Sequence, residues 1–151
     1  MKKETIYIAS DHGGFLLKET LKRYLESLGF VVLDVGATSL NDTDDYPQYA
    51  FALAHEVVSK QKSRGIVLCG SGQGVCITAN RMKGIRAVQA WNVASAKMSR
   101  NDDDANVLCL GARLISTRQA KEIVNVWLET PFAKETRFKR RIKKIDKGKA
   151  V

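Results

Sequence analysis

Short apolar runs alternate with longer stretches of helical periodicity along most of the chain. β-branched and other apolar residues form runs of strand length at 5–9, 30–35, 65–69, 85–90 and 106–110. Helical spacing marks the stretches between and after them: 17–28, ended by Gly29 in the position that a left-handed C-cap prefers, then 47–60, 74–83, 93–100 and 117–129. Because the strands read as apolar on both faces, the pattern predicts an α/β fold, with a doubly wound sheet of about five parallel strands between two helical layers.

The size and composition of the chain fit one domain. Its 151 residues, 44% of them hydrophobic, can bury a continuous core, so we expect a single domain over 1–151. The first residues are charged and run straight into an apolar strand without a signal-peptide core, and no apolar stretch approaches the ~20 residues that span a bilayer. We therefore expect a cytoplasmic protein that does not enter a membrane.

The net charge of +9 predicts an anionic partner, and this charge is concentrated at one end of the chain. Residues 134–149 hold nine Lys or Arg against two acidic residues, a net of +7. An apolar stripe at helical spacing runs through this segment, so we expect a helix over about 131–147. Arg137 and Arg141 flank the stripe and are candidates for binding an anion. Most of the lysines are expected to lie on a basic face that is exposed to solvent.

A basic segment of this kind also occurs in proteins that bind nucleic acid. A non-enzymatic protein that binds nucleic acid or a nucleotide therefore stays open as an alternative. Against it, the segment lacks the aromatic platform on which bases stack. We expect a phosphorylated small molecule, and not nucleic acid, as the anionic partner.

The chain has three cysteines and two histidines, which are few for a disulfide framework or a metal centre. The cysteines are odd in number and lack CxxC spacing, so we expect no zinc site and no bound metal. A free thiol is most often a small buried hydrophobic side chain. Cys76 and Cys109 fit this description, since one falls on a predicted helix and the other inside an apolar strand.

The third predicted strand ends in the densest candidate motif. Cys69 is its last residue, and a loop that leads into a helix follows: Gly70, Ser71, Gly72, Gln73 and Gly74. Three glycines at alternate positions let the backbone turn its N–H groups inward as an anion-binding nest, although the spacing matches neither a P-loop nor a dinucleotide fingerprint. Amide donors and the positive end of a helix dipole stabilise a thiolate. Cys69 is therefore a candidate base or nucleophile at the carboxyl edge of the sheet, where such folds bind their ligands.

Other strand ends offer further polar groups. Asp11 and His12 follow the first strand; Asp11 can act simply as a helix cap, whereas His12 is expected to face a ligand. Arg113 follows the fifth strand, where a guanidinium can hold phosphate in a bidentate fashion. The acidic run 102–104 precedes that strand, and we interpret it as a solvated loop or helix cap rather than a cation site.

Taken together, these motifs resemble the ribose-5-phosphate isomerase type B family, which includes the subunits of galactose-6-phosphate isomerase. The resemblance covers nearly the whole chain and depends on several motifs in the same order. They are Ala9 to Gly14, Asp45-Tyr46-Pro47, Leu68 to Gly72, Ala79 to Arg81 with Gly84 to Ala87, Ala105 to Val107, Leu110 to Arg113, and Arg137 with Arg141.

The resemblance implies a Rossmann-like fold, a homodimer or tetramer, and an active site between subunits that uses no metal or cofactor. It implies that Cys69 moves a proton between C2 and C1 of an open-chain sugar phosphate, while the N–H groups of 70–74 stabilise an enediolate oxygen. Three residues match family residues at the sugar: Asp11, His12 and Tyr46. Three arginines match substrate contacts, those of the last helix reaching the phosphate from the neighbouring chain: Arg113, Arg137 and Arg141.

Two positions depart from the family pattern. Asp102 stands where the ribose-5-phosphate enzymes usually carry a histidine for ring opening, and Asp103, a candidate substrate contact, replaces the usual asparagine. A carboxylate can accept the anomeric proton, and neighbouring acidic groups favour its protonated form, which can return a proton to the ring oxygen. We hypothesise that Asp102 opens the sugar ring.

The predicted reaction is the conversion of ribose 5-phosphate to ribulose 5-phosphate through a cis-enediolate. A hexose 6-phosphate of the allose or galactose type is the alternative substrate, because the family's hexose-phosphate members also vary at 102 and 103.

Overall fold

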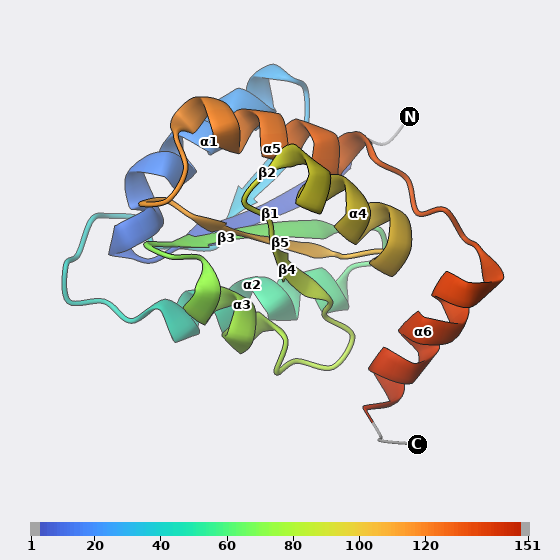
Figure 1. Cartoon of the computed structure of the whole chain (residues 1–151). Coiled ribbons are helices and arrows are strands. Elements are labelled where there is room, and N and C mark those ends of the chain that lie inside the picture. Colours follow the sequence, from blue (N-terminus) through green and yellow to red (C-terminus); the bar gives the residue numbers. More distant parts are fainter. Residues whose placement is uncertain (1–3, 149–151) are drawn as a thin grey trace.

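The computed structural model describes residues 4–148, so both ends of the predicted 1–151 domain, including Lys149 of the basic segment, lie outside the described residues. Five parallel strands form one sheet (Figure 1). They are β1 (Thr5–Ser10), β2 (Val31–Asp34), β3 (Arg64–Cys69), β4 (Ala87–Gln89) and β5 (Val107–Gly111), in the order β2-β1-β3-β5-β4. The predicted α/β fold is confirmed.

Helices cover both faces of this sheet. In the described part of the chain they are the 3-10 turn η1 (His12–Gly14), α1 (Phe15–Ser27), α2 (Tyr46–Ser59), α3 (Gln73–Ala79), α4 (Val93–Asp103), α5 (Thr117–Glu129) and α6 (Thr136–Lys147). Figure 1 shows α1, α4 and α5 on one face and α2 and α3 on the other, with α6 set apart from these layers. Among the described residues, no helix combines the length and apolar character needed to cross a bilayer.

Alternating residues of the strands build two separate cores. Ile6 and Ile8 of β1 pack with the α1 and α5 side, whereas Tyr7 and Ala9 pack with the α2 and α3 side. The expectation of apolar strands covered on both faces holds for β1, β3 and β5 but is wrong for β2. This strand lies at the sheet edge, and its Val31 and Leu33 side chains are each 44% exposed.

Two helix ends differ from the predicted ones. The side-chain amide of Asn80 bonds both the N–H and the C=O of Ala87, each at 2.8 Å, which ends α3 at Ala79 and starts the turn into β4. At α4 the helix continues past the predicted end to Asp103, and Asp104 is its left-handed C-cap. Asp102 and Asp103 therefore lie in a last helical turn and not in a loop. The predicted left-handed glycine after α1 is confirmed, since Gly29 has φ 89°.

A buried ion pair fixes the segment that leads from β2 to α2. Lys18 of α1 is fully buried and donates hydrogen bonds to Asp34 Oδ2, at 2.7 Å, and to the carbonyl of Ala37, at 2.6 Å. The backbones of Gly36 and Ala37 also bond Ser10 at the end of β1. The start of this loop is thereby held at the carboxyl edge of the sheet.

Candidate active site

The carboxyl ends of β1, β3 and β5 bring together residues that are distant in the sequence. These three strands are neighbours in the sheet and run parallel, so the turns that follow them meet at one edge. A Cβ built on Gly13, in the turn after β1, would lie 2.9 Å from the backbone nitrogen of Gly70. The turn that carries His12 therefore packs directly on the glycine loop after β3.

Cys69 lies at the end of β3 with its sulfur beside that loop. The backbone N–H of Gly72 donates a hydrogen bond to Cys69 Sγ, at 3.1 Å. The residue is 4% exposed in the single chain and belongs to the core on the α2 and α3 side. Within one chain, Cys69 is therefore a buried residue, and it lines neither of the two hollows described below.

Each glycine of the loop has a close neighbour, and Gly72 is the most restricted of the three. Gly72 has φ +76°, and a Cβ there would lie 2.8 Å from the backbone of Gly111. A Cβ at Gly70 would lie 2.9 Å from the Arg113 guanidinium, and one at Gly74 would lie 2.5 Å from the Tyr46 ring. Arg113 and Tyr46 therefore pack against the loop that follows Cys69.

Two of the loop's five amides are engaged inside the protein. Gly72 N–H bonds the sulfur of Cys69, and Gln73 N–H donates to the Ser71 hydroxyl at 3.3 Å. Ser71 and Gln73 are exposed, and the Gln89 side chain donates to the Ser71 carbonyl from β4. The loop is thus held from both sides.

Asp11 caps the turn after β1. Its Oδ1 accepts a hydrogen bond from Gly14 N–H at 3.1 Å, and the residue is 6% exposed. Burial raises the pKa of Asp11, although the hydrogen bonds from Gly14 and Gly13 act in the opposite direction. The capping role considered from the sequence is therefore present, beside the residues of the candidate site.

His12 pairs with a residue that the sequence did not single out. Its backbone N–H and its ring Nδ1 both meet Oδ1 of Asp44, at 3.0 Å and 2.7 Å. Asp44 lies in the polar loop before α2, 32 positions away, where no periodicity or spacing identifies one carboxylate among several. The other histidine, His55, has a 70% exposed side chain on α2, as expected for a solvated residue.

Ligand-type atoms of Asp11, His12 and Asp44 all lie within 4.8 Å of one another. Each of the three side chains already makes a hydrogen bond within the protein. We therefore interpret the group as a hydrogen-bonded cluster and not as a metal centre.

A hollow of about 500 Å³ opens next to His12. Arg113 and Asp42 also line it, together with apolar side chains such as Leu16 and Leu40. Cys69 does not line this hollow.

The remaining candidate residues lie at the opposite edge of the sheet. Since α4 returns to the amino end of β5, Asp102 and Asp103 lie at the amino edge, and α6 packs beside the end of α4 (Figure 1). Within one chain, the structure therefore separates Asp102, Asp103, Arg137 and Arg141 from Cys69.

These four residues form a group of their own. Burial and the nearby Asp102 carboxylate raise the pKa of Asp103, while the charges of Arg141 and Arg86 act to lower it. Asp102 accepts a hydrogen bond from Asn101 at 2.7 Å. Arg137 is exposed, donates to Glu135 at 2.7 Å and lies 4.6 Å from the centre of the Phe138 ring. The group places two carboxylates and two guanidinium groups on the same side of the molecule.

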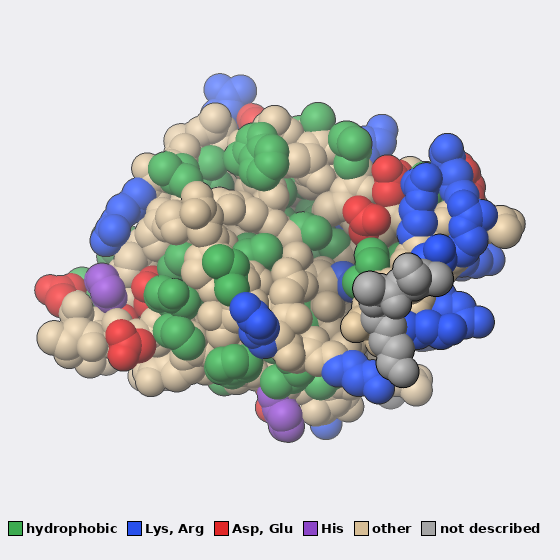
Figure 2. All heavy atoms as spheres, turned by 60° about the horizontal axis from the view of Figure 1, so that its bottom comes forward, with side chains coloured by type: hydrophobic (Ala, Val, Ile, Leu, Met, Phe, Trp, Pro, Cys, Tyr) green, Lys and Arg blue, Asp and Glu red, His purple; other side chains and the backbone are tan. Residues whose placement is uncertain are grey.

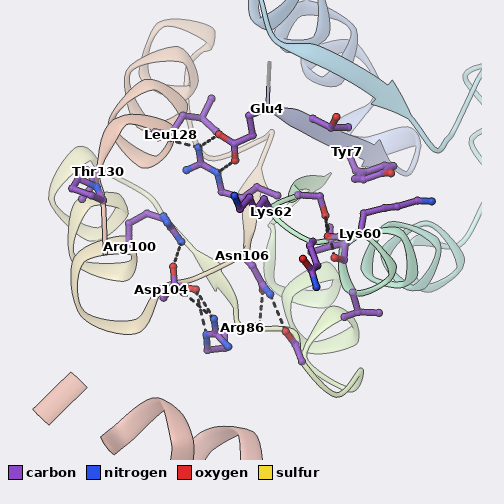
Figure 3. A pocket seen from close by; sticks show the side chains of 18 of the residues that line it. Glu4, Tyr7, Lys60, Lys62, Arg86, Arg100, Asp104, Asn106, Leu128 and Thr130 are labelled. Carbon is purple, nitrogen blue, oxygen red and sulfur yellow. Dashed lines mark hydrogen bonds and ion pairs between the residues drawn. The ribbon is translucent and has the colours of Figure 1, made fainter. Parts of the chain in front are cut away.

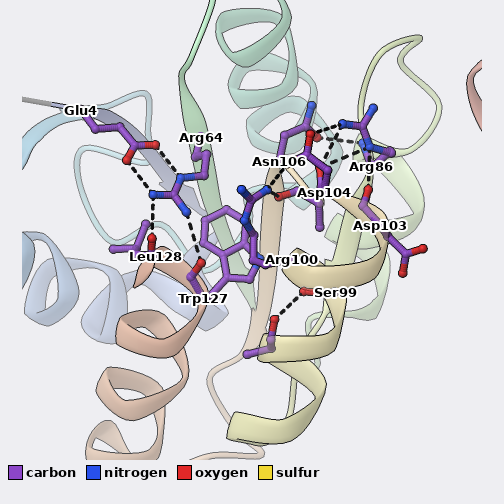
Figure 4. A network of polar contacts seen from close by, with 12 residues as sticks. Glu4, Arg64, Arg86, Ser99, Arg100, Asp103, Asp104, Asn106, Trp127 and Leu128 are labelled. Atoms are coloured by element: carbon purple, nitrogen blue, oxygen red, sulfur yellow. Dashed lines mark hydrogen bonds and ion pairs between the residues drawn. The ribbon is translucent and has the colours of Figure 1, made fainter. Parts of the chain in front are cut away.

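A larger hollow, of about 1150 Å³, also lies at the amino edge (Figure 3). Its arginines are occupied by protein partners (Figure 4): Arg64 bonds Glu4 and the carbonyls of Trp127 and Leu128, and Arg100 bonds Asp104 at 2.7 Å. We therefore interpret this network as structural.

The surface combines apolar side chains with a basic helix. Figure 2 shows hydrophobic side chains scattered over the body and Lys and Arg side chains gathered over α6. Large apolar side chains that are more than half exposed include Leu16 and Leu40, which line the hollow next to His12, and also Ile77, Trp91, Met98 and Leu114.

Comparisons with known proteins show which family the chain resembles. The model of the ribose/galactose isomerase family matches residues 6–145. The chain is 43% identical, over 93% of its length and 91% of the relative, to a probable ribose-5-phosphate isomerase B of Mycoplasma pneumoniae. It is 40% identical, over 85% of its length and 84% of the relative, to the D-erythrulose-4-phosphate isomerase of Pectobacterium atrosepticum.

A solved structure is similar over nearly the whole fold. The ribose-5-phosphate isomerase B of Mycoplasma genitalium, solved with bound ribulose 5-phosphate, superimposes with a TM-score of 0.91 at 38% identity. The match covers 95% of each chain.

Proposed function

The chain belongs to the ribose/galactose isomerase family and is an isomerase, and we propose that it interconverts ribose 5-phosphate and ribulose 5-phosphate in the cytoplasm, without a metal or cofactor. One observation carries the proposal: the Cys69 sulfur accepts a hydrogen bond from a glycine-loop amide at the end of a parallel strand. Tyr46 and Arg113 pack on the same loop, and the turn that holds His12 adjoins it.

In the proposed mechanism, the Cys69 thiolate removes the proton from C2 of the open-chain aldose phosphate. The electrons move to the carbonyl oxygen O1 and form a cis-enediolate. The proton of the C2 hydroxyl passes to O1, and the same sulfur returns its own proton to C1, so that O2 becomes the carbonyl oxygen of the ketose. The Gly72 N–H stabilises the thiolate, and the remaining loop amides are the donors proposed for the enediolate oxygen.

The proposed site is completed by a second copy of the chain. Asp102, Asp103, Arg137 and Arg141 lie at the far edge of the sheet from Cys69, so they can join it only from a neighbouring subunit in a homodimer or a tetramer. We propose that Arg137 and Arg141 of the neighbour bind the phosphate, opposite Arg113, and that Asp103 contacts the sugar. The exposed apolar residues around the site supply a surface for this contact.

The packing of α6 supports this arrangement. Phe138 is the one buried residue of this 12-residue helix in the described structure. Burying one such side chain is worth ~1.5–3 kcal/mol, and an isolated helix of this length is marginal in water. Contact with a second copy would bury more of the apolar stripe that includes Ile145, which is 54% exposed.

Ring opening is assigned to Asp102 of the neighbouring copy. Free pentose 5-phosphates are mainly cyclic, so a group must move a proton from the anomeric hydroxyl to the ring oxygen before C2 becomes acidic. Asp102 sits beside Asp103 in the last turn of α4, where burial and the Asp102 carboxylate raise the pKa of Asp103.

Proton NMR in deuterated water tests the proposal. The protein is mixed separately with ribose 5-phosphate, allose 6-phosphate, galactose 6-phosphate and D-erythrulose 4-phosphate. We expect exchange at the carbon next to the carbonyl, and net isomerisation, first with ribose 5-phosphate. Exchange with a hexose 6-phosphate alone would overturn the pentose assignment. Salt-sensitive oligonucleotide binding with no exchange on any sugar phosphate would favour the binding-protein alternative.

A further inference from the structure

The carboxylate of Asp44 holds His12 at two points. Oδ1 accepts hydrogen bonds from the His12 backbone N–H, at 3.0 Å, and from ring Nδ1, at 2.7 Å. The Asp44 side chain is 2% exposed, whereas the His12 side chain is 30% exposed. One end of the pair is therefore fixed inside the protein, and the other reaches the surface of the candidate site.

This contact determines which ring nitrogen a ligand can meet. A carboxylate accepts hydrogen bonds, so Nδ1 must carry a hydrogen, and Nε2 is the nitrogen left for a ligand. His12 lines the hollow of about 500 Å³ that Arg113 also lines. An anionic oxygen in this hollow would meet a guanidinium and an imidazole from the same chain.

The charges around His12 favour its protonated form. The hydrogen bond to Asp44 raises the pKa of His12; desolvation acts against this, and the charges of Asp11, Asp44 and Asp42 reinforce it. Arg113 is the cation on the other side of the hollow. Three carboxylates thus face the imidazole from two loops, against one guanidinium.

The complementary shift appears at Asp44. Burial acts to raise the pKa of Asp44, but the hydrogen bonds from the His12 ring and backbone, together with Tyr49 of α2, lower it overall. The proton of the pair therefore belongs to His12.

We propose that Asp44 is a positioning residue: it holds Nδ1 of the His12 imidazole, so that Nε2 is left to bind the phosphate of a substrate in the hollow that Arg113 also lines. The identity of this anion depends on the proposed function, but the Asp44–His12 pair is a property of the free protein. The two parts can therefore be tested separately.

Nitrogen-15 NMR of the free protein tests the pair. The chain has two histidines, so the His55→Gln variant assigns both sets of ring signals. We expect His12 to carry a hydrogen on Nδ1 and to titrate above the ordinary value of a histidine, about 6.5. In Asp44→Asn the His12 midpoint should fall toward that ordinary value. A His12 without a hydrogen on Nδ1, or with an unshifted midpoint, in the unmutated protein would overturn the proposal without any variant having to fold.

Kinetics then separate positioning from a purely structural role. For Asp44→Asn we expect a KM for ribose 5-phosphate raised about tenfold at pH 8. Near pH 5.5, where an unpaired imidazole is protonated, KM should return toward the unmutated value. Sulfate keeps a constant charge over this range, so its inhibition constant should also be raised at pH 8 and return toward the unmutated value near pH 5.5. A pH-independent rise in KM would show a structural effect instead.

Asp45→Asn is the matched control. Asp45 lies next to Asp44, is exposed, and makes no capping hydrogen bond at α2. This variant removes the same charge from the same loop but keeps the contact between Asp44 and His12. The pH dependence of its KM should therefore match that of the unmutated protein. If the protein turned over no sugar phosphate, the proposed function would fail, while the NMR titration would still decide whether Asp44 sets the state of His12.

Discussion

The backbone N–H of Gly72 donates a hydrogen bond to the sulfur of Cys69 across 3.1 Å. Gly72 has a φ of +76°, and a side chain at this position would collide with the backbone of Gly111. Both features favour glycine here. The hydrogen bond therefore depends on the end of β3, on the left-handed conformation of Gly72 and on the neighbouring strand β5. It gives the thiol a fixed hydrogen-bond donor, on which the base role proposed for Cys69 depends.

Replacing Cys69 should remove the base. We expect Cys69→Ala to lower kcat for ribose 5-phosphate by about 10²–10⁴-fold, the range typical of a positioned general base. Cys76→Ala is the control, since Cys76 lies on α3 and is only partly buried, and it should keep most of the activity. Full turnover by Cys69→Ala, measured by coupled assay with circular dichroism as a check on folding, would make the assignment wrong.

Mixed subunits should test the shared site. Cys69→Ala and the double variant Arg137→Ala/Arg141→Ala each lack one half of the proposed site and should be nearly inactive. Random pairing of the two would give half heterodimers, each with one intact site, and therefore about a quarter of the unmutated activity.

Co-expression with two affinity tags isolates these heterodimers. A Cys69→Ala/Cys69→Ser mixture is the control and should stay inactive, since both copies lack the base. If the heterodimers of the first mixture had no activity above the parents, each site would be contained in one chain, and the role proposed for α6 would fail.

The neighbourhood of Cys69 could be predicted from the sequence because parallel strands place all their carboxyl ends at one edge. Cys69 and Arg113 end neighbouring strands, so the strand pattern alone brings them close. Asp44 could not be found this way. Its contact with His12 depends on the path of the loop after β2, which Lys18 and Asp34 hold through a buried ion pair and not through any repeated pattern.

The sequence pattern also could not predict that the candidate residues of one chain divide into two groups at opposite edges of the sheet. The resemblance implied a site between subunits, but the strand and helix pattern does not say on which edge a helix end lies until the strand order is known. The end of α3 was missed for a similar reason, because the bonds between Asn80 and Ala87 depend on a contact across seven residues. Contacts made by single polar side chains therefore set the limits of the prediction.

Removing the buried cation of this loop should destabilise the protein. Lys18→Met leaves the largely buried carboxylate of Asp34 without its closest partner, and we expect a loss of about 3–5 kcal/mol in the free energy of unfolding. Lys22→Met, which removes the longer, partly exposed contact to the same carboxylate, should cost less than about 1 kcal/mol. Urea unfolding at pH 7 measures both, and equal effects would contradict the assignment.

The same pair predicts a pH dependence. Burial acts to raise the pKa of Asp34, but the hydrogen bonds from Lys18 and Gly36 lower it overall. A carboxyl with a lowered folded-state pKa stabilises the fold above its unfolded value, about 3.9, and this stability is lost as the pH falls through the folded-state pKa. Unfolding curves between pH 6 and pH 3 should therefore show a steeper acid loss in the unmutated protein than in Asp34→Asn. Parallel curves would mean that Asp34 contributes no such dependence.

Ring opening can be separated from isomerisation by the choice of sugar. Ribose 5-phosphate closes a five-membered ring, whereas a tetrose 4-phosphate cannot, because its only suitable hydroxyl carries the phosphate. If Asp102 opens the ring, Asp102→Asn should lower kcat/KM for ribose 5-phosphate by about 10²-fold and leave D-erythrose 4-phosphate nearly unaffected. A base or phosphate defect, as in Cys69→Ala, would lower both. Equal losses on the two sugars would therefore exclude Asp102 from ring opening and assign it a general role in the site, and no loss on either would leave it outside the reaction.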